Sequence, residues 1–166
     1  MGYQTFLGAS GTSTGSSNVA IGSFALNANT TASYSTAVGY QAGYSNTTGL
    51  VTAFGYQAMY SHTTGSANTA MGNQALKSTT TGSNNVAIGE TALYSNTTAS
   101  YNTAIGYQSA YNNTTGTHNV SIGYGTLAGT SGTTTGSYNT AIGNLALTSN
   151  TTASNNTAVG YQAGYN

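Results

Sequence analysis

Residues 102–118 read Asn-Thr-Ala-Ile-Gly-Tyr-Gln-Ser-Ala-Tyr-Asn-Asn-Thr-Thr-Gly-Thr-His, and close copies of this 17-residue unit fill nearly the whole chain. The glycine at its fifth position returns at intervals of 16, 17 or 20 residues. These glycines are Gly22, Gly39, Gly55, Gly72, Gly89, Gly106, Gly123, Gly143 and Gly160. A disordered tract has no reason to keep one residue type at one phase of every unit, so the periodicity predicts a folded repeat protein.

Positions 2 to 4 of the unit are rich in β-branched residues, and helix formers are scarce throughout, so each unit is predicted to begin with a short strand. A second short strand is predicted for the Tyr-Gln-Ala-Leu segment that follows the glycine. The glycine itself indicates a corner with positive φ or a close backbone approach. The Asn-Thr-Thr-Gly segment reads as the return turn. The chain is therefore predicted to be all-β, a parallel β-solenoid whose equivalent residues stack about 4.8 Å apart.

The predicted domain organisation is one repeat domain over residues 1–166, with about nine 17-residue coils. Both ends interrupt a coil, which led us to expect a segment of a longer fibre. The coils are 18–34, 35–50, 51–67, 68–84, 85–101, 102–118, 119–138 and 139–155, with partial coils at 1–17 and 156–166.

An apolar residue precedes each corner glycine, and we predicted that this fourth-position column fills the coil interior as the structural core. Its members are Ile21, Val38, Phe54, Met71, Ile88, Ile105, Ile122, Ile142 and Val159. The third position is alanine in every coil except at Ser121, and we expected this column to pack against another chain. One or two large apolar residues per coil are too few to offset the entropy of ordering a whole coil, so the sequence favours association of several chains.

Fourteen tyrosines supply uncharged apolar area, mostly at the sixth and tenth positions of the unit. They are interpreted either as stacked ladders that cover the flanks of the solenoid or as an adhesive or sugar-binding surface. The candidate surface contacts are Tyr40, Tyr44, Tyr56, Tyr60, Tyr107 and Tyr111.

Composition excludes several classes of function, because Lys77 and Glu90 are the only charged side chains and cysteine is absent. Nucleic-acid binding needs clustered basic residues, whereas acid–base catalysis and hard-metal sites need carboxylates. We therefore expected no enzyme activity, cofactor, metal site or nucleic-acid partner. The apolar stretches are too short to insert into a membrane, and the first residues do not read as a signal peptide. Two histidines, His62 and His118, were interpreted as surface variants of the repeat.

Two further patterns lie in the turns. Asn-Xaa-Thr sequons recur at Asn29, Asn46, Asn96, Asn113 and Asn150, and they read as a turn preference rather than as a glycan array. Two neighbouring threonine columns, beginning at Thr30 and Thr31, leave an ice-binding β-solenoid as an alternative function. Adjacent strand residues face opposite sides, however, and a hydrogen-bonded turn ladder also explains the pair.

The Asn-Val-Ala-Ile-Gly of residues 18–22 and 85–89 and the Asn-Thr-Ala-Ile-Gly of residues 102–106 resemble the head repeats of YadA-like trimeric autotransporter adhesins. Residues 156–165 also resemble repeats of phage and virus tail-fibre proteins. The resemblance implies a left-handed β-roll that associates side by side as a trimer. It also implies exposure outside the cell or on a virion, where the rod is a stalk or binds a glycan or host receptor. The unit is longer than the usual adhesin repeat by its Asn-Thr-Thr-Gly turn. A self-assembling extracellular filament is the other alternative.

Overall fold

The computed structural model describes residues 13–129 and 133–165, and regular structure there consists of nine short strands with no helix. The predicted partial coil 1–17 is thus described only from residue 13. The strands are β1 (Val19–Ile21), β2 (Thr36–Val38), β3 (Val51–Phe54), β4 (Asn68–Met71), β5 (Val86–Ile88), β6 (Thr103–Ile105), β7 (Val120–Ile122), β8 (Thr140–Ile142) and β9 (Thr157–Val159).

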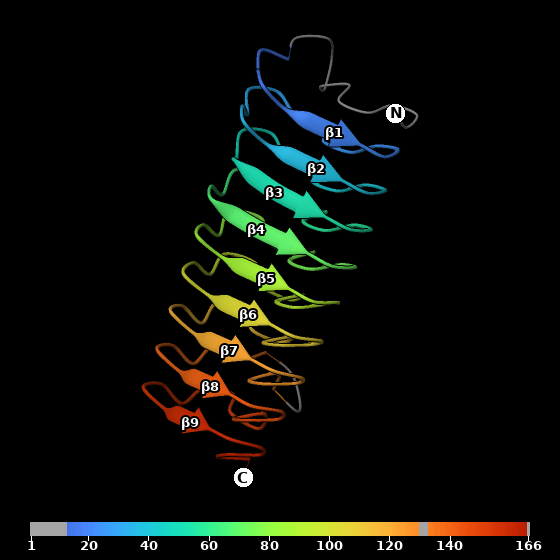
Figure 1. Ribbon diagram of the computed structural model, residues 1–166. Coiled ribbons are helices and arrows are strands. Elements are labelled where there is room, and N and C mark those ends of the chain that lie inside the picture. The colour runs from blue at the N-terminus through green and yellow to red at the C-terminus, as the bar shows by residue number, and fades with distance from the viewer. Residues whose placement is uncertain (1–12, 130–132, 166) are drawn as a thin grey trace.

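All nine strands form one parallel sheet in chain order, and the chain returns behind the sheet between successive strands (Figure 1). Each strand pairs with the next at equivalent repeat positions, as Ala87 does with Ala104. This register survives the 16-residue coil, where Ala37 pairs with Ala53, and the 20-residue coil, where Ser121 pairs with Ala141. The prediction of an all-β parallel solenoid is therefore confirmed, and differences in coil length are absorbed outside the sheet.

The chain leaves each strand through the fifth-position glycine, whose φ lies between +122° and +143° in all nine copies. A β-carbon added to Gly106 would lie 2.5 Å from the carbonyl oxygen of Gly123 in the next coil. The corner therefore combines a left-handed backbone with close backbone contact between coils. The second strand expected after it is wrong: this segment forms turns, with left-handed residues such as Gln108 (φ 53°) and Ala110 (φ 51°).

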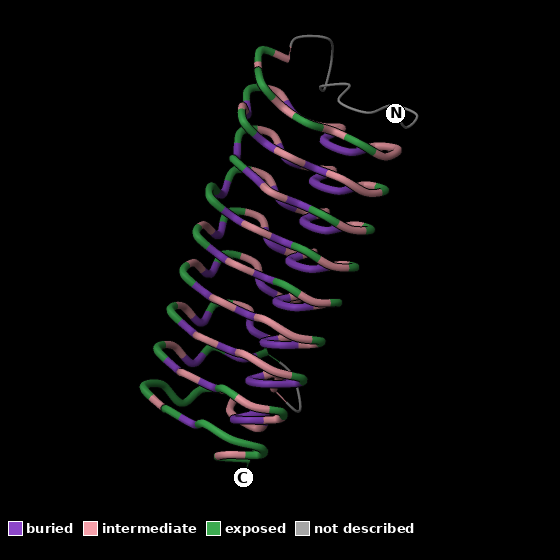
Figure 2. Tube along the Cα trace, viewed as in Figure 1, coloured by how far each residue is buried: buried purple, intermediate pink, exposed green. Residues whose placement is uncertain are grey.

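The fourth-position column lies on the outside of the coil, so our assignment of it as the structural core is wrong. Side chains alternate along each strand, and the first and third positions face inward while the second and fourth face outward. In Figure 2, buried residues alternate with more exposed ones along the strands, and further buried stretches lie on the return segments behind the sheet. Six members of the column are between 36% (Ile88) and 67% (Val159) exposed, and the other three are half-buried. The misplaced residues are Ile21, Val38, Phe54, Met71, Ile88, Ile105, Ile122, Ile142 and Val159.

The interior is built instead from the third-position alanines, the eighth position and the large residues of the ninth position, such as Leu76 and Leu93. The reason is the width of the coil. At Gly43, a ninth-position glycine, an added β-carbon would lie 3.8 Å from the β-carbon of Ala37 on the strand across the same coil. A leucine at the ninth position fills this space only if the strand presents a small side chain. The alanines are therefore buried within one chain, and the expectation that they pack against another chain is also wrong.

Asparagine at the first position of the unit joins neighbouring coils from inside. The amide nitrogen of Asn102 donates to the carbonyl oxygen of Gly116 (2.9 Å), which closes its own coil. Its oxygen accepts the backbone N–H of Asn119 in the next coil (3.0 Å). The same pair of bonds recurs at Asn85, so the column stabilises both the shape of a coil and the stacking of coils.

Asn102→Ala is expected to lower the free energy of unfolding by about 2–3 kcal/mol, because it leaves the buried N–H of Asn119 without its acceptor. The matched control is Asn156→Ala in the last coil, where the asparagine is only partly buried; its cost should be under about 1 kcal/mol. Urea unfolding of both variants measures the difference. Equal costs would mean that the interior column contributes no more than an exposed amide.

Candidate functional surfaces

A column of large apolar side chains runs along the outer face of the nine-stranded sheet. The two columns of this face are the Val or Thr side chains of the second position and the Ile, Val, Phe or Met side chains of the fourth position. Ile21 is 52% exposed and Met71 is 44% exposed, and the column continues through all nine strands. Contiguous exposed apolar side chains mark interaction sites on proteins, which makes this outer sheet face a candidate interface.

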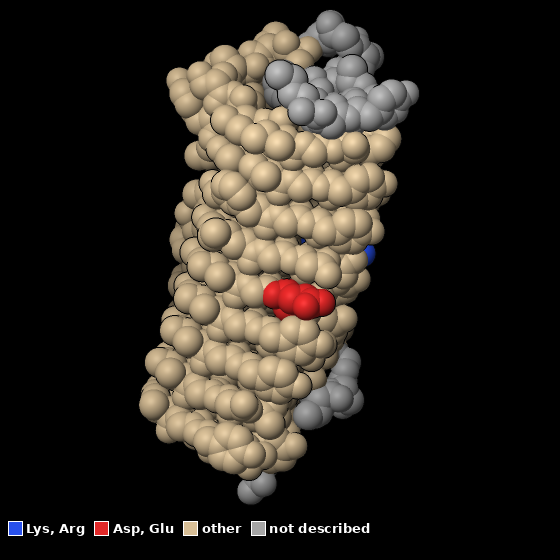
Figure 3. Space-filling model, turned by 45° about the vertical axis from the view of Figure 1, so that its right-hand side comes forward, with Lys and Arg blue, Asp and Glu red and all other residues tan. Residues whose placement is uncertain are grey.

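Charge is nearly absent from the molecular surface. Figure 3 shows one acidic patch and, at the right-hand edge of the view, a small basic one on a surface that is otherwise uncharged. The Lys77 ammonium lies 5.5 Å from the centre of the Tyr94 ring, and Glu90 accepts a long hydrogen bond (3.5 Å) from Asn73. Neither charge lies in the apolar columns of the sheet.

The tyrosine columns form short stacks along the solenoid. Tyr40 stacks on Tyr56 with ring centres 5.6 Å apart, and Tyr44 stacks on Tyr60 at 5.0 Å. A glutamine ladder accompanies them at the seventh position, where the Gln57 amide donates to Gln41 (2.8 Å). Two further stacks repeat the arrangement, and they are Tyr94 with Tyr111 and Tyr107 with Tyr124.

Stacking limits what these rings can bind. The tyrosine stacks are pairs, so each ring covers one face of its partner and leaves at most one face on which a sugar could stack. The ring edges and phenolic hydroxyls remain available in the sixth-position column, where Tyr40, Tyr56 and Tyr107 are 42–49% exposed. Tyr44, Tyr60 and Tyr111 in the tenth-position column are only partly exposed. The geometry thus favours hydrogen bonding at this surface over ring stacking.

The two threonine columns of the turn differ from each other. The hydroxyl of Thr63 donates to the carbonyl oxygen of Thr80 (2.9 Å), and the same bond repeats along the first column. The second column, with Thr64 and Thr81, is exposed. Because the hydroxyl protons of the first column are used within the turn, only one column presents free hydroxyls to solvent.

The turn asparagines lie inside the coil. Asn29, Asn46, Asn96 and Asn113 are at most 1% exposed, and each amide donates to the carbonyl three residues later. A glycan on any of these four would have to leave the folded interior. The preference for Asn-Thr-Thr is thus a structural one, with the asparagine holding the turn from within.

The two histidines have opposite environments. His118 is exposed and stacks between Tyr101 and Tyr138, at 4.8 Å from each ring. His62 is fully buried, so its interpretation as a surface variant is wrong. Desolvation lowers the pKa of His62 from 6.5 to about 4, although a backbone hydrogen bond with Gly65 acts in the opposite direction.

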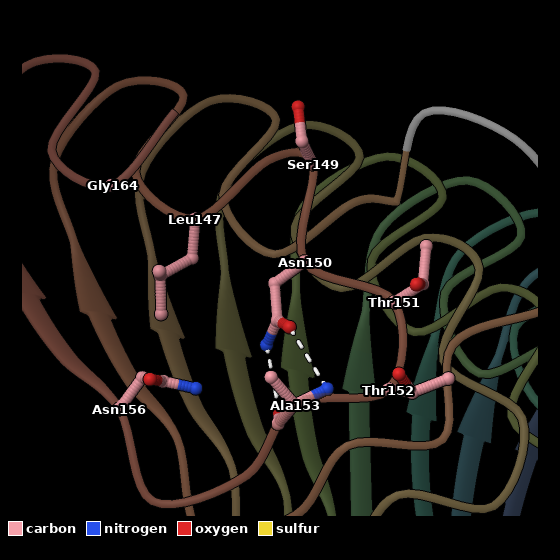
Figure 4. A pocket seen from close by; sticks show the side chains of 8 residues that line it. All are labelled: Leu147, Ser149, Asn150, Thr151, Thr152, Ala153, Asn156 and Gly164. Carbon is pink, nitrogen blue, oxygen red and sulfur yellow. Dashed lines mark hydrogen bonds between the residues drawn. The ribbon is translucent and has the colours of Figure 1, made fainter. Parts of the chain in front are cut away.

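A cavity of about 400 Å³ lies beside the turn of the coil 139–155. Figure 4 shows Asn150 bonded in both directions to Ala153 across it, with Leu147 and Gly164 at its other side. The equivalent residues of earlier coils are covered by the next turn, whereas the last coil is described only to residue 165. No ionisable side chain lines the cavity, and we interpret it as the stacking surface of a coil.

Within residues 13–129 and 133–165, no cluster of three potential metal ligands occurs, and there is no helix of the length and hydropathy needed to cross a bilayer. Comparisons with protein-family models, with curated proteins and with solved structures find no match to this chain. Functional reasoning therefore depends on the surfaces described above.

Proposed function

We propose that this protein is a structural and adhesive fibre segment, a stalk or receptor-binding rod of a surface adhesin or of a phage or virus tail fibre. The observation that carries the proposal is the outer sheet face, an apolar strip that runs through all nine strands of a charge-poor solenoid. A strip of this kind suits lateral association of elongated chains. The resemblance of the repeat to adhesin heads adds the extracellular location, the left-handed winding and the count of three chains.

The outer sheet face is the surface that we propose to bury in the trimer. Burying large apolar side chains such as Ile88 and Ile142 contributes favourable free energy in proportion to their exposed area, with no charge to desolvate. The small residues of the unit are already used inside the coil, so the association that was expected through alanine is reassigned to the fourth position. Because the strands of every copy are parallel and equally spaced, copies that lie side by side would bring their fourth-position columns into contact along the whole length of the sheet.

The sixth-position tyrosines border the outer sheet face directly after the corner glycine. We propose that Tyr40, Tyr56 and Tyr107 contribute ring edges and hydroxyls to contacts with a glycan or another host-surface receptor, with Tyr44, Tyr60 and Tyr111 supporting them from the tenth position. Because the chain has almost no charge, such a receptor would be recognised through neutral hydrogen-bonding groups rather than through ion pairs.

The decisive experiment is the solution mass of the full chain with and without a charge on the outer sheet face. The 16.6 kDa chain should sediment as a trimer, and Ile88→Lys should weaken association by about 100-fold or more, because it places an unpaired charge in an apolar interface. Thr98→Lys adds the same charge to the exposed turn column of the same coil and should leave the trimer intact.

Circular dichroism of each variant shows whether the solenoid itself is preserved. A wild-type chain that remains a monomer at high concentration would contradict the proposal, as would a trimer that tolerates Ile88→Lys. If Thr98→Lys also dissociated the trimer, the interface would have to be placed on the turns instead of the sheet.

A further inference from the structure

The repeat departs from its consensus at several points in coils 35–50 and 51–67. The first position holds Ser35 and Val51 in these two coils, whereas it is asparagine in all the remaining coils from residue 18 onward. The coil 35–50 also has 16 residues instead of 17. His62 occupies the twelfth position, where other coils have asparagine or threonine. Ser35 and Val51 adjoin, because the backbone N–H of Val51 donates to the Ser35 hydroxyl (3.2 Å). The imidazole of His62 reaches from the turn column to the first-position column, where it meets Asn68.

The His62 ring connects three successive coils through its two nitrogens. Nδ1 lies 3.0 Å from the amide oxygen of Asn46 in the preceding coil, and Nε2 lies 3.1 Å from the amide nitrogen of Asn68 in the following coil. The orientation of both amides is fixed by other bonds. The Asn46 nitrogen donates to the Gly49 carbonyl, and the Asn68 oxygen accepts the backbone N–H of Asn85.

These orientations determine the protonation state of the ring. The Asn46 oxygen can only accept, so Nδ1 carries the hydrogen, and the Asn68 nitrogen can only donate, so Nε2 is bare. A proton added to Nε2 would point at an N–H group with no acceptor between them. The clasp formed by Asn46, His62 and Asn68 therefore exists only with a neutral imidazole.

Apart from the backbone hydrogen bond with Gly65, which offsets only part of the desolvation, the surroundings do not stabilise a charged imidazole. Its ring contacts Asn46, Asn68 and the backbone at Gly49 and Gly65, and none of these groups is titratable. The strands β3 and β4 on either side carry no charged residue. The only carboxylate side chain, Glu90, is exposed after β5 and bonds to Asn73, and Lys77 lies against Tyr94.

We propose that the clasp of Asn46, His62 and Asn68 is an acid-sensitive joint of the solenoid. Above pH 6.5 the neutral ring holds coils 35–50, 51–67 and 68–84 together, and on acidification the ring takes up a proton, loses its bond to Asn68 and lets these coils separate locally. The remaining coils keep their stacking. The joint is a property of a single chain and does not depend on the proposed assembly.

The direction of the pH dependence follows from linkage. An ordinary histidine titrates near pH 6.5, whereas the pKa of His62 in the folded chain is about 4, so the opened state binds more protons between these values. The stability of the joint is complete above pH 6.5 and is lost progressively as the pH falls toward 4. The equilibrium constant for local opening should rise by about 100-fold across this interval.

Hydrogen exchange of the full chain at pH 7.5 and 4.5 tests the proposal, after correction for the intrinsic pH dependence of exchange. Amides of residues 35–84 should lose about 100-fold in protection at the lower pH, while amides of residues 85–125 should change little. His62→Asn restores the residue that Asn46 and Asn96 provide in their own turns, and it should abolish this loss. His118→Tyr removes the exposed histidine and should behave as wild type.

Imidazole titration by NMR in the wild-type chain provides a second readout that needs no variant. His62 should stay neutral down to about pH 4, and His118 supplies an exposed histidine in the same sample for comparison. Titration of His62 near pH 6.5 would overturn the proposal. So would an unchanged loss of protection in His62→Asn, or in His62→Gln if the first variant failed to fold.

Discussion

Gly106→Ala should lower the free energy of unfolding by about 3–6 kcal/mol, a large effect for a single methyl group. Two causes combine at this position. The residue has φ +131°, which an L-amino acid adopts only with strain. The new β-carbon would also lie 2.5 Å from the carbonyl oxygen and 2.7 Å from the carbonyl carbon of Gly123. Both are backbone atoms of the next coil, so the contact is relieved only by moving the coils apart.

Gly160→Ala separates the two causes. Gly160 has nearly the same φ (+127°), but an added β-carbon would meet no atom within 4 Å. It should therefore cost only the backbone strain, about 1–3 kcal/mol. Guanidinium unfolding of both variants gives the two free energies. If Gly106→Ala and Gly160→Ala cost the same, close approach between coils is not what excludes a side chain from the corner.

The solenoid itself could be predicted from the sequence because it depends on periodicity. A glycine and an apolar residue that keep their phase through coils of 16, 17 and 20 residues can be accommodated together only if the coils stack in register. The alternation of side chains along a strand was equally readable. The alternation does not tell which of the two sets of side chains faces inward.

The inward-facing set was predicted wrongly because large apolar residues were assumed to fill the interior. The deciding information lies six residues away, at the ninth position, where Leu76 or Leu93 occupies the space opposite the strand. When the ninth position is a leucine, only a small side chain fits on the strand across from it: alanine in most coils and serine at Ser121. The uniform alanines of the third position, which we took as a contact with another chain, were in fact the signal for this narrow interior.

Interior polar residues were the other feature that the sequence concealed. Asn46 and Asn96 were interpreted as turn residues, because Asn-Thr-Thr-Gly is a common turn composition, and His62 was interpreted as a surface variant of the same turn. The structure buries all three. The absence of charge at this position was no clue to its burial, because charged residues are almost absent from every position of the repeat.

Leu93→Ala and Ile88→Ala test the corrected interior directly. Leu93 is fully buried among the alanines of its own and neighbouring coils, and its truncation should cost about 3–4 kcal/mol by lost burial and the cavity left behind. Ile88 lies five residues earlier on β5 and is 36% exposed on the outer sheet face. Its truncation should cost under about 1.5 kcal/mol in the isolated chain, because much of its surface is already in water.

The comparison is made by urea unfolding of dilute protein, so that association does not add to the measured stability. At concentrations where the chains assemble, the affinity between folded chains is measured as well. Ile88→Ala should lower this affinity, whereas Leu93→Ala should leave it nearly unchanged. If Ile88→Ala proved the more destabilising variant in dilute solution, the fourth-position column would belong to the interior after all, and the outer sheet face could not be the surface through which the chains associate.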